Sequence, residues 1–130
     1  MDRQLDRIAD AHGVRLLVQF GSTVARTTHP GSDVDLAVLL DRPDPSYGDL
    51  ADLQAALQPL FPGREIDLGL LNHADPLFLH QVTERGVLLV GAPDQWQALR
   101  AYAFKRYQDH RRFLAMERDY VARFIERAGR

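Results

Sequence analysis

The sequence predicts an α/β fold in which a sheet of about four strands is flanked by helices and followed by a long helical region. Four short apolar runs bounded by turn residues predict the strands, at residues 14–20, 33–40, 64–71 and 87–91. Amphipathic stretches predict helices at residues 3–11, 49–58, 76–85 and 93–128. Because strands and helices alternate along most of the chain, we expect a layered α/β domain.

Local signals place the ends of these elements. His12-Gly13 is a helix stop signal, and Asp75-Pro76 has the pattern of an N-cap followed by proline in the first turn. Ser22 could cap a short helix at residues 23–27. Leucines recur at helical spacing in residues 50–60, which predicts a helix that covers one face of the sheet.

The last helical region carries two apolar stripes. Trp96, Leu99, Ala103 and Tyr107 form the first, and Phe113, Met116, Tyr120 and Phe124 form the second. We expect the second stripe to lie in the core; the alternative is that it faces a partner or a second subunit.

Composition limits the class of protein. The 130 residues fit one domain, 1–130, with a core at about 14–90 and a helical region at 93–128. There is no cysteine, which excludes a disulfide framework and a cysteine nucleophile. No apolar run approaches the length of a membrane span, so we expect a cytoplasmic protein without membrane contact.

Charge is distributed unevenly along the chain. The net charge of −2 argues against a dedicated nucleic-acid binder, but residues 100–130 hold nine Lys or Arg against four acids. The rest of the chain is acidic, which suits a cation site. A basic tail suits an acidic partner, a phosphate or RNA, and it could equally be a solvated helix face.

Two aspartates in the second predicted strand are the strongest candidates for chemistry. Asp33 and Asp35 are two residues apart, so their side chains point to the same face of the strand. Carboxylates this close repel each other unless a cation lies between them, and Mg²⁺ is bound by one or two carboxylates together with phosphate oxygens. The structural alternative is a pair of edge acids that oppose aggregation.

A turn upstream of the aspartates offers donors for a phosphate. The first strand ends at Gly21-Ser22, where glycine allows close approach of the backbone and free amides attract anions. A third carboxylate would complete a two-metal site. Asp67, in the third predicted strand, is the candidate, and Glu65 on the same face is the runner-up.

Other catalytic patterns are missing from the sequence. The five histidines show no H-E-x-x-H arrangement, Ser22 lies in no G-x-S-x-G motif, and no glycine-lysine-serine or glycine-lysine-threonine follows Gly21. Zinc, serine-hydrolase and Walker-type sites are therefore disfavoured.

Gly21-Ser22, followed by Asp33-x-Asp35 and by Asp67 on a later strand, resembles the nucleotidyltransferase superfamily of DNA polymerase beta. The pattern is most similar to the minimal nucleotidyltransferase (MNT) domains, many of which are antitoxins of HEPN ribonuclease toxins. The resemblance covers residues 14–90 and implies a polymerase beta-like fold with a mixed sheet.

The resemblance implies a transfer of AMP from ATP to a hydroxyl, most often a tyrosine of the HEPN toxin with which the antitoxin assembles. Asp33 and Asp35 would bind one or two Mg²⁺ ions, and Asp67 would bind one ion and help to activate the acceptor. Gly21, Ser22 and Arg26 would hold the nucleotide. No direct binding of nucleic acid is expected.

The segment between these anchors departs from the family pattern. Family members commonly read G-S-x-A-R-G, whereas Val24, Ala25 and Arg26 occupy the last three places here, so that the arginine comes one position later. Two other functions remain open: a non-catalytic antitoxin that neutralises its partner by binding, and an adenylyltransferase for a small molecule such as an aminoglycoside.

Overall fold

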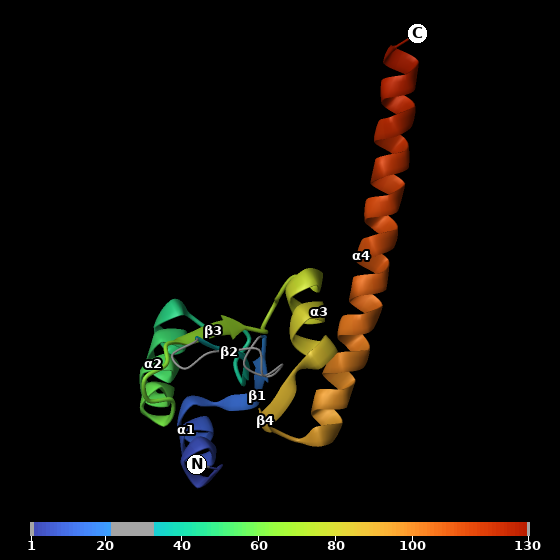
Figure 1. Cartoon of the computed structure of the whole chain (residues 1–130). Helices are drawn as coiled ribbons and strands as arrows, with labels where there is room; N and C mark the ends of the chain where they lie inside the picture. Colours follow the sequence, from blue (N-terminus) through green and yellow to red (C-terminus); the bar gives the residue numbers. More distant parts are fainter. Residues whose placement is uncertain (1, 22–32, 130) are drawn as a thin grey trace.

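The computed structural model describes residues 2–21 and 33–129, which fold into a four-stranded sheet with helices on both faces and one long C-terminal helix (Figure 1). In chain order the elements are α1 (Asp2–His12), β1 (Val14–Phe20), β2 (Val34–Leu40), α2 (Tyr47–Leu57), the 3₁₀ helix η1 (Gln58–Leu60), β3 (Ile66–Leu70), α3 (Pro76–Arg85), β4 (Val87–Val90) and α4 (Pro93–Ala128). The short helix expected at residues 23–27 lies outside the described residues.

The sheet is mixed, as the resemblance implied. Its strand order is β3-β2-β1-β4; β1 pairs with β2 and with β4 in antiparallel fashion, and β2 pairs with β3 in parallel. The C-terminal end of β1 and the N-terminal ends of β2 and β3 therefore meet at the same edge of the sheet. Gly21, Asp33, Asp35 and Asp67 all belong to this edge.

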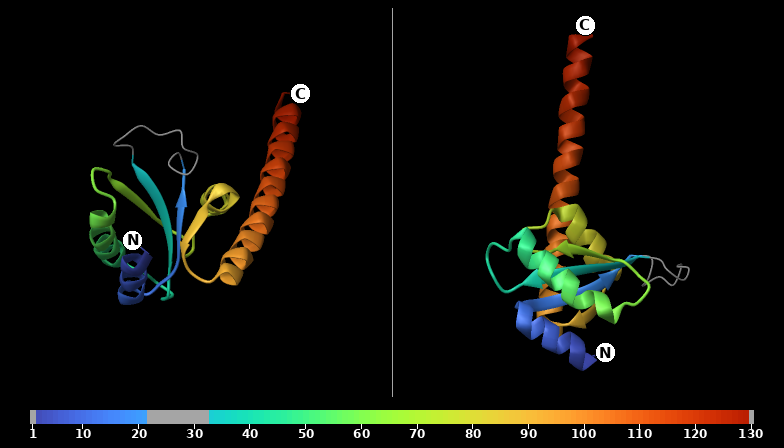
Figure 2. Two further views of the ribbon diagram at one scale, coloured as in Figure 1. Left: turned by 60° about the horizontal axis from the view of Figure 1, so that its bottom comes forward. Right: turned by 90° about the vertical axis from the view of Figure 1, so that its left-hand side faces the viewer.

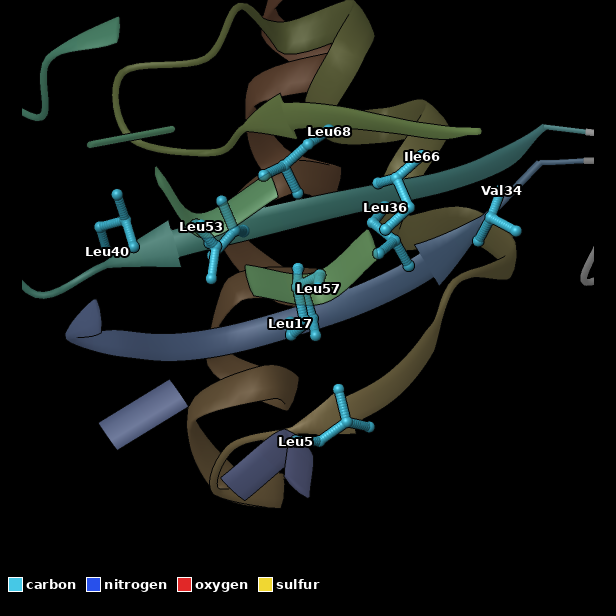
Figure 3. Close-up of a cluster of buried hydrophobic side chains, with 10 residues drawn as sticks. Leu5, Leu17, Val34, Leu36, Leu40, Leu53, Leu57, Ile66 and Leu68 are labelled. Atoms are coloured by element: carbon cyan, nitrogen blue, oxygen red, sulfur yellow. The ribbon is translucent and has the colours of Figure 1, made fainter. Parts of the chain in front are cut away.

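Each face of the sheet is covered by helices, as Figure 2 shows in two further views. On the face of α1 and α2, alternate strand residues form one buried cluster, which Figure 3 draws. It includes Leu17 of β1, Leu36 of β2 and Ile66 of β3. On the other face, Val18 and Ala37 pack with residues of α3 and α4 in a second cluster. Alternation along β2 thus places Asp35 on the side of α3 and α4.

The helix α2 begins earlier than the sequence predicts, because Ser46 and Asp49 form a capping box. The backbone N–H of Ser46 donates to the Asp49 carboxylate (2.8 Å), and the backbone N–H of Asp49 donates to the Ser46 hydroxyl (3.1 Å). In α3, the Asp75 carboxylate accepts from the backbone N–H of Phe78 (2.9 Å), which confirms the predicted N-cap.

The first half of α4 packs on α3, and the second half extends away from the rest of the described chain (Figure 1). Trp96 and Ala103 are buried, and the ring of Tyr107 stacks on His80 with centroids 3.7 Å apart. From Arg111 to Gly129 every residue is exposed.

The expectation that the second stripe of α4 lies in the core is therefore wrong. Phe113, Met116, Tyr120 and Phe124 are between 57% and 72% exposed. The reason is geometric: α3 is 10 residues long and α4 is 36, so α3 covers only the first turns of the longer helix. Among the residues that the structure describes, none of the helices has both the length and the apolar composition needed to span a membrane.

Candidate active site

Gly21 and Asp35 touch where β1 ends. Phe20 is the register partner of Asp35 across the antiparallel β1–β2 pair, and Gly21 follows with a φ of +81°. A Cβ built on Gly21 would collide with Oδ2 of Asp35 and would lie 3.1 Å from its Cγ. The chain therefore needs glycine here for two reasons, the left-handed backbone and the close approach of the carboxylate.

Asp67 lies directly beside Asp35. The two aspartates are register partners on the parallel strands β2 and β3, and neighbouring strands are about 4.8 Å apart. The pairing reaches the edge of the sheet, where the backbone N–H of Val34 donates to the carbonyl of Glu65 (2.9 Å). Asp33 comes one residue before β2 and is exposed.

The carboxylates interact electrostatically. The pKa of Asp35 is raised above its ordinary value of 3.8, first by its partial burial and then by the negative charges of Asp67 and Asp33. The three side chains thus form one repulsive cluster centred on Asp35. A cation at this edge would relieve the repulsion.

Two aromatic rings, Phe20 and Phe78, pack on the same face of the sheet beside the carboxylates, and they were not among the predicted site residues. Gly69 lies two residues after Asp67 on the same face of β3, and a Cβ there would collide with the ring of Phe78. The ring of Phe78 in turn meets Phe20 edge to face, with centroids 5.8 Å apart. A glycine inside a strand often marks such a close approach, and Gly69 was the available signal.

Oxygen ligands from carboxylates suit a hard divalent ion. In the part of the chain described by the structure, no three side chains of the kinds that ligate metals converge closely enough to hold an ion by themselves. Two carboxylates with phosphate oxygens from a substrate are sufficient for Mg²⁺. Asp35 is two residues from Asp33 in the sequence and is the register partner of Asp67 in the sheet. The donor set therefore fits a magnesium ion that is bound together with a nucleotide.

Two predicted nucleotide-binding residues, Ser22 and Arg26, lie outside the described residues, as do Val24 and Ala25. Glu65, the runner-up to Asp67, is exposed and precedes β3. Asp67 is the acid that pairs with Asp35 and raises its pKa.

Solved structures with the same fold come from toxin–antitoxin systems. A chain of a toxin–antitoxin crystal structure with AMP-PNP matches with a TM-score of 0.73 and 22% identity over 96% of this chain and 98% of that chain. A chain of the tri-AMPylated Shewanella oneidensis HEPN toxin in complex with MNT antitoxin matches with a TM-score of 0.66 and 20% identity, over 96% and 95% of the two chains. A chain of the MntA-HepT toxin–antitoxin structure matches with a TM-score of 0.62 and 20% identity, over 96% of each chain.

These matches span nearly the whole chain, so the shared fold includes most of α4 as well as the sheet. No curated protein is similar enough in sequence to count as a match. The sequence profile of one family, described as polymerase beta, nucleotidyltransferase, matches residues 3–95. These residues contain the sheet and all three aspartates of the candidate site. The chain therefore belongs to the polymerase beta nucleotidyltransferase family.

Proposed function

We propose that this nucleotidyltransferase moves AMP from ATP to a tyrosine hydroxyl of a cognate HEPN ribonuclease toxin in the cytoplasm, and that it thereby acts as the antitoxin. The observation that carries the proposal is the carboxylate cluster of Asp33, Asp35 and Asp67 beside the Gly21 turn. The toxin–antitoxin structures with AMP-PNP and with an AMPylated toxin support the choice of nucleotide and acceptor.

In the proposed reaction, the tyrosine oxygen attacks the α-phosphorus of ATP. The new oxygen–phosphorus bond forms as the bond from the α-phosphorus to the bridging oxygen breaks, and pyrophosphate leaves. Asp67 receives the proton of the hydroxyl, because a carboxylate within hydrogen-bond reach can act as general base. AMP remains bound to the toxin.

The other residues position the nucleotide. Gly21 and Ser22 hold the triphosphate through backbone donors, and Arg26 adds a positive charge. Asp33 and Asp35 would hold the metal together with phosphate oxygens of the nucleotide, and Asp67 would be a further ligand in that complex. When bound there, Mg²⁺ neutralises phosphate charge and polarises the α-phosphoryl group.

The direct test incubates the protein with ATP labelled at the α-phosphorus, Mg²⁺ and the purified HEPN protein encoded beside its gene. We expect label on a toxin tyrosine, and none with the doubly substituted Asp33→Asn, Asp35→Asn protein. An unlabelled toxin in the wild-type reaction would rule out this acceptor. Pyrophosphate release with an aminoglycoside and no protein acceptor would instead support the small-molecule transferase.

A second candidate function is neutralisation by binding alone. The exposed apolar half of α4 favours it, because this half offers a large contact surface that needs no chemistry. The two candidates differ in one cellular test. If the Asp33→Asn, Asp35→Asn protein protects cells from the toxin as well as the wild type does, neutralisation does not depend on AMP transfer.

A further inference from the structure

The second half of α4 carries a broad apolar face that the described part of the chain leaves open to solvent. Tyr120 is 72% exposed, Met116 66% and Phe124 64%. Helices in proteins owe most of their stability to the packing of an apolar face, and an isolated segment of this length is marginal in water. Packing of another chain on this face would therefore stabilise the outer half of α4.

One side of this face continues the side that packs on α3. Trp96, Ala103 and Tyr107 contact α3 in the first half of α4. Further steps of seven, seven and four residues lead to Leu114, Val121 and Ile125, which at about 3.6 residues per turn lie along the same line. These three residues line a surface groove of about 600 Å³ together with Ala122 and with the charged residues Glu117 and Arg118.

The lengths of α3 and α4 indicate how long a partner helix would have to be to cover the exposed half of α4. The covered stretch from Trp96 to Tyr107 is about 16 Å long at 1.5 Å per residue, and α3 is about 15 Å long. The uncovered stretch from Leu114 to Ala128 is about 21 Å long, or about four turns. A helix that follows the line of α3 would fit this stretch.

A second row of apolar side chains widens the face. Phe113, Met116, Tyr120 and Phe124 adjoin the first row, so that the two rows together span about half of the helix circumference. Two charged residues interrupt this face: Glu117 lies between the rows, and Arg127 lies in the second row near the end of the helix. This is broader than one pair of helices needs. It suits an apolar helix face that lies in a groove of its partner.

The charges at the borders of the face disfavour pairing with a second copy. Residues 111–129 hold five arginines against three acids. Arg111 and Arg118 lie along one border of the face, and Arg112 and Arg123 lie along the other. In either orientation, two copies of α4 would bring arginines of one helix against arginines of the other, which is unfavourable.

We propose that the outer half of α4 is the docking surface for the toxin, and that it binds a helical apolar groove of the HEPN partner bordered by acidic side chains. This inference rests on the proposed function, which supplies the identity of the partner. The kind of surface expected follows from α4 alone: an apolar face with arginine borders selects an acidic, helical surface. Docking through α4 involves none of the residues assigned to the transfer of AMP.

Val121→Asp tests the proposal in the full-length chain, because it places a charge at the centre of the row that continues the α3 side. We expect the Kd for the purified HEPN partner, measured without ATP, to rise about tenfold or more. Ala115→Asp is the matched control. It introduces the same charge on the opposite side of α4 from Phe113 and Phe124, at an exposed site, and should leave the Kd within about twofold.

Arg118→Glu tests the charged border. We expect weaker binding at low salt, and a smaller difference from the wild type at high salt, because salt screens exposed charges. An unchanged Kd for Val121→Asp would overturn the proposal, and so would a wild-type chain that does not bind the HEPN protein. If the chain alone is a dimer that Val121→Asp dissociates, the occupant is a second copy and the proposal is wrong. Because none of these measurements uses ATP, they can fail while the transfer of AMP succeeds, or the reverse.

Discussion

Replacing Gly21 by alanine should impair the proposed chemistry far more than it impairs folding. The new Cβ would collide with the carboxylate of Asp35, which would have to rotate away from the space that it shares with Asp67. A catalytic group misplaced by about 1 Å can cost about a hundredfold in rate. We expect Gly21→Ala to lower the rate of AMP transfer by about that factor.

The cost in stability can be worked out from the backbone. Gly21 has a φ of +81°, and a left-handed conformation costs a residue with a Cβ about 1–2 kcal/mol. With an unfolding entropy of about 2.1 cal/mol/K per residue, a chain of 130 residues loses about 4 °C in Tm per kcal/mol. Gly21→Ala should therefore lower Tm by about 4–7 °C.

Gly63 provides the control. Its φ is +74°, but a Cβ at this position would meet no atom within 4 Å. Gly63→Ala should therefore show a similar drop in Tm and keep its transfer rate. Calorimetry and the rate of label transfer to the HEPN partner would be measured for both variants. If the two transfer AMP at rates within about threefold of each other, contact between Gly21 and Asp35 does not matter for catalysis and the reasoning fails.

Three further variants test the electrostatics of two aspartates and the hydrogen bonds at the end of β2. Because the folded-state pKa of Asp35 lies above 3.8, the folded state binds its proton more tightly, and stability falls as pH rises through that raised value. Asp67→Asn should shift the pKa of Asp35 downward in an NMR titration and stabilise the fold at neutral pH, while AMP transfer is lost. The pKa of Asp49 is lowered, chiefly by the backbone N–H of Ser46, so its stabilisation is present above pH 3.8 and is lost as pH falls through the lowered value. Urea unfolding of Asp49→Asn should show lower stability at pH 7 and a weaker loss in acid, and an unchanged acid dependence would contradict this. Asn72→Ala removes side-chain hydrogen bonds to the backbone at the end of β2 and should cost about 1–3 kcal/mol in the same assay.

The order of helices and strands could be predicted because apolar periodicity reports local structure. The strand expected at residues 14–20 matches β1, and the N-cap at Asp75 forms as expected. The predicted start of α2 is two residues late, because the prolines before Ser46 indicate a loop and the capping box of Ser46 lies at the end of that loop. Such a cap depends on side-chain contacts that composition alone does not predict.

The register of the sheet could not be predicted from the sequence. The sequence indicates Asp67 because it is an acid in an apolar strand, but its position beside Asp35 depends on the parallel pairing of β2 with β3, two elements separated by α2. The same limit applies to the two aromatic rings, because Phe78 reaches Gly69 only once α3 has packed on the sheet. The course of α4 beyond α3 was also missed, since an apolar stripe looks the same whether it faces the core or a partner.

The way in which the sheet holds its acids explains why this edge can carry chemistry despite the repulsion. Val34 lies between Asp33 and Asp35 and is 2% exposed, and Ile66 beside Asp67 is 1% exposed. Each acid therefore neighbours an apolar side chain that is fixed in the opposite face of the sheet, in the cluster of Figure 3. Burial of these side chains stabilises the strands by about 1.5–3 kcal/mol each, which offsets the cost of bringing three carboxylates together. The same anchoring limits the freedom of the acids, so that they are already positioned for the proposed binding of a metal and a nucleotide.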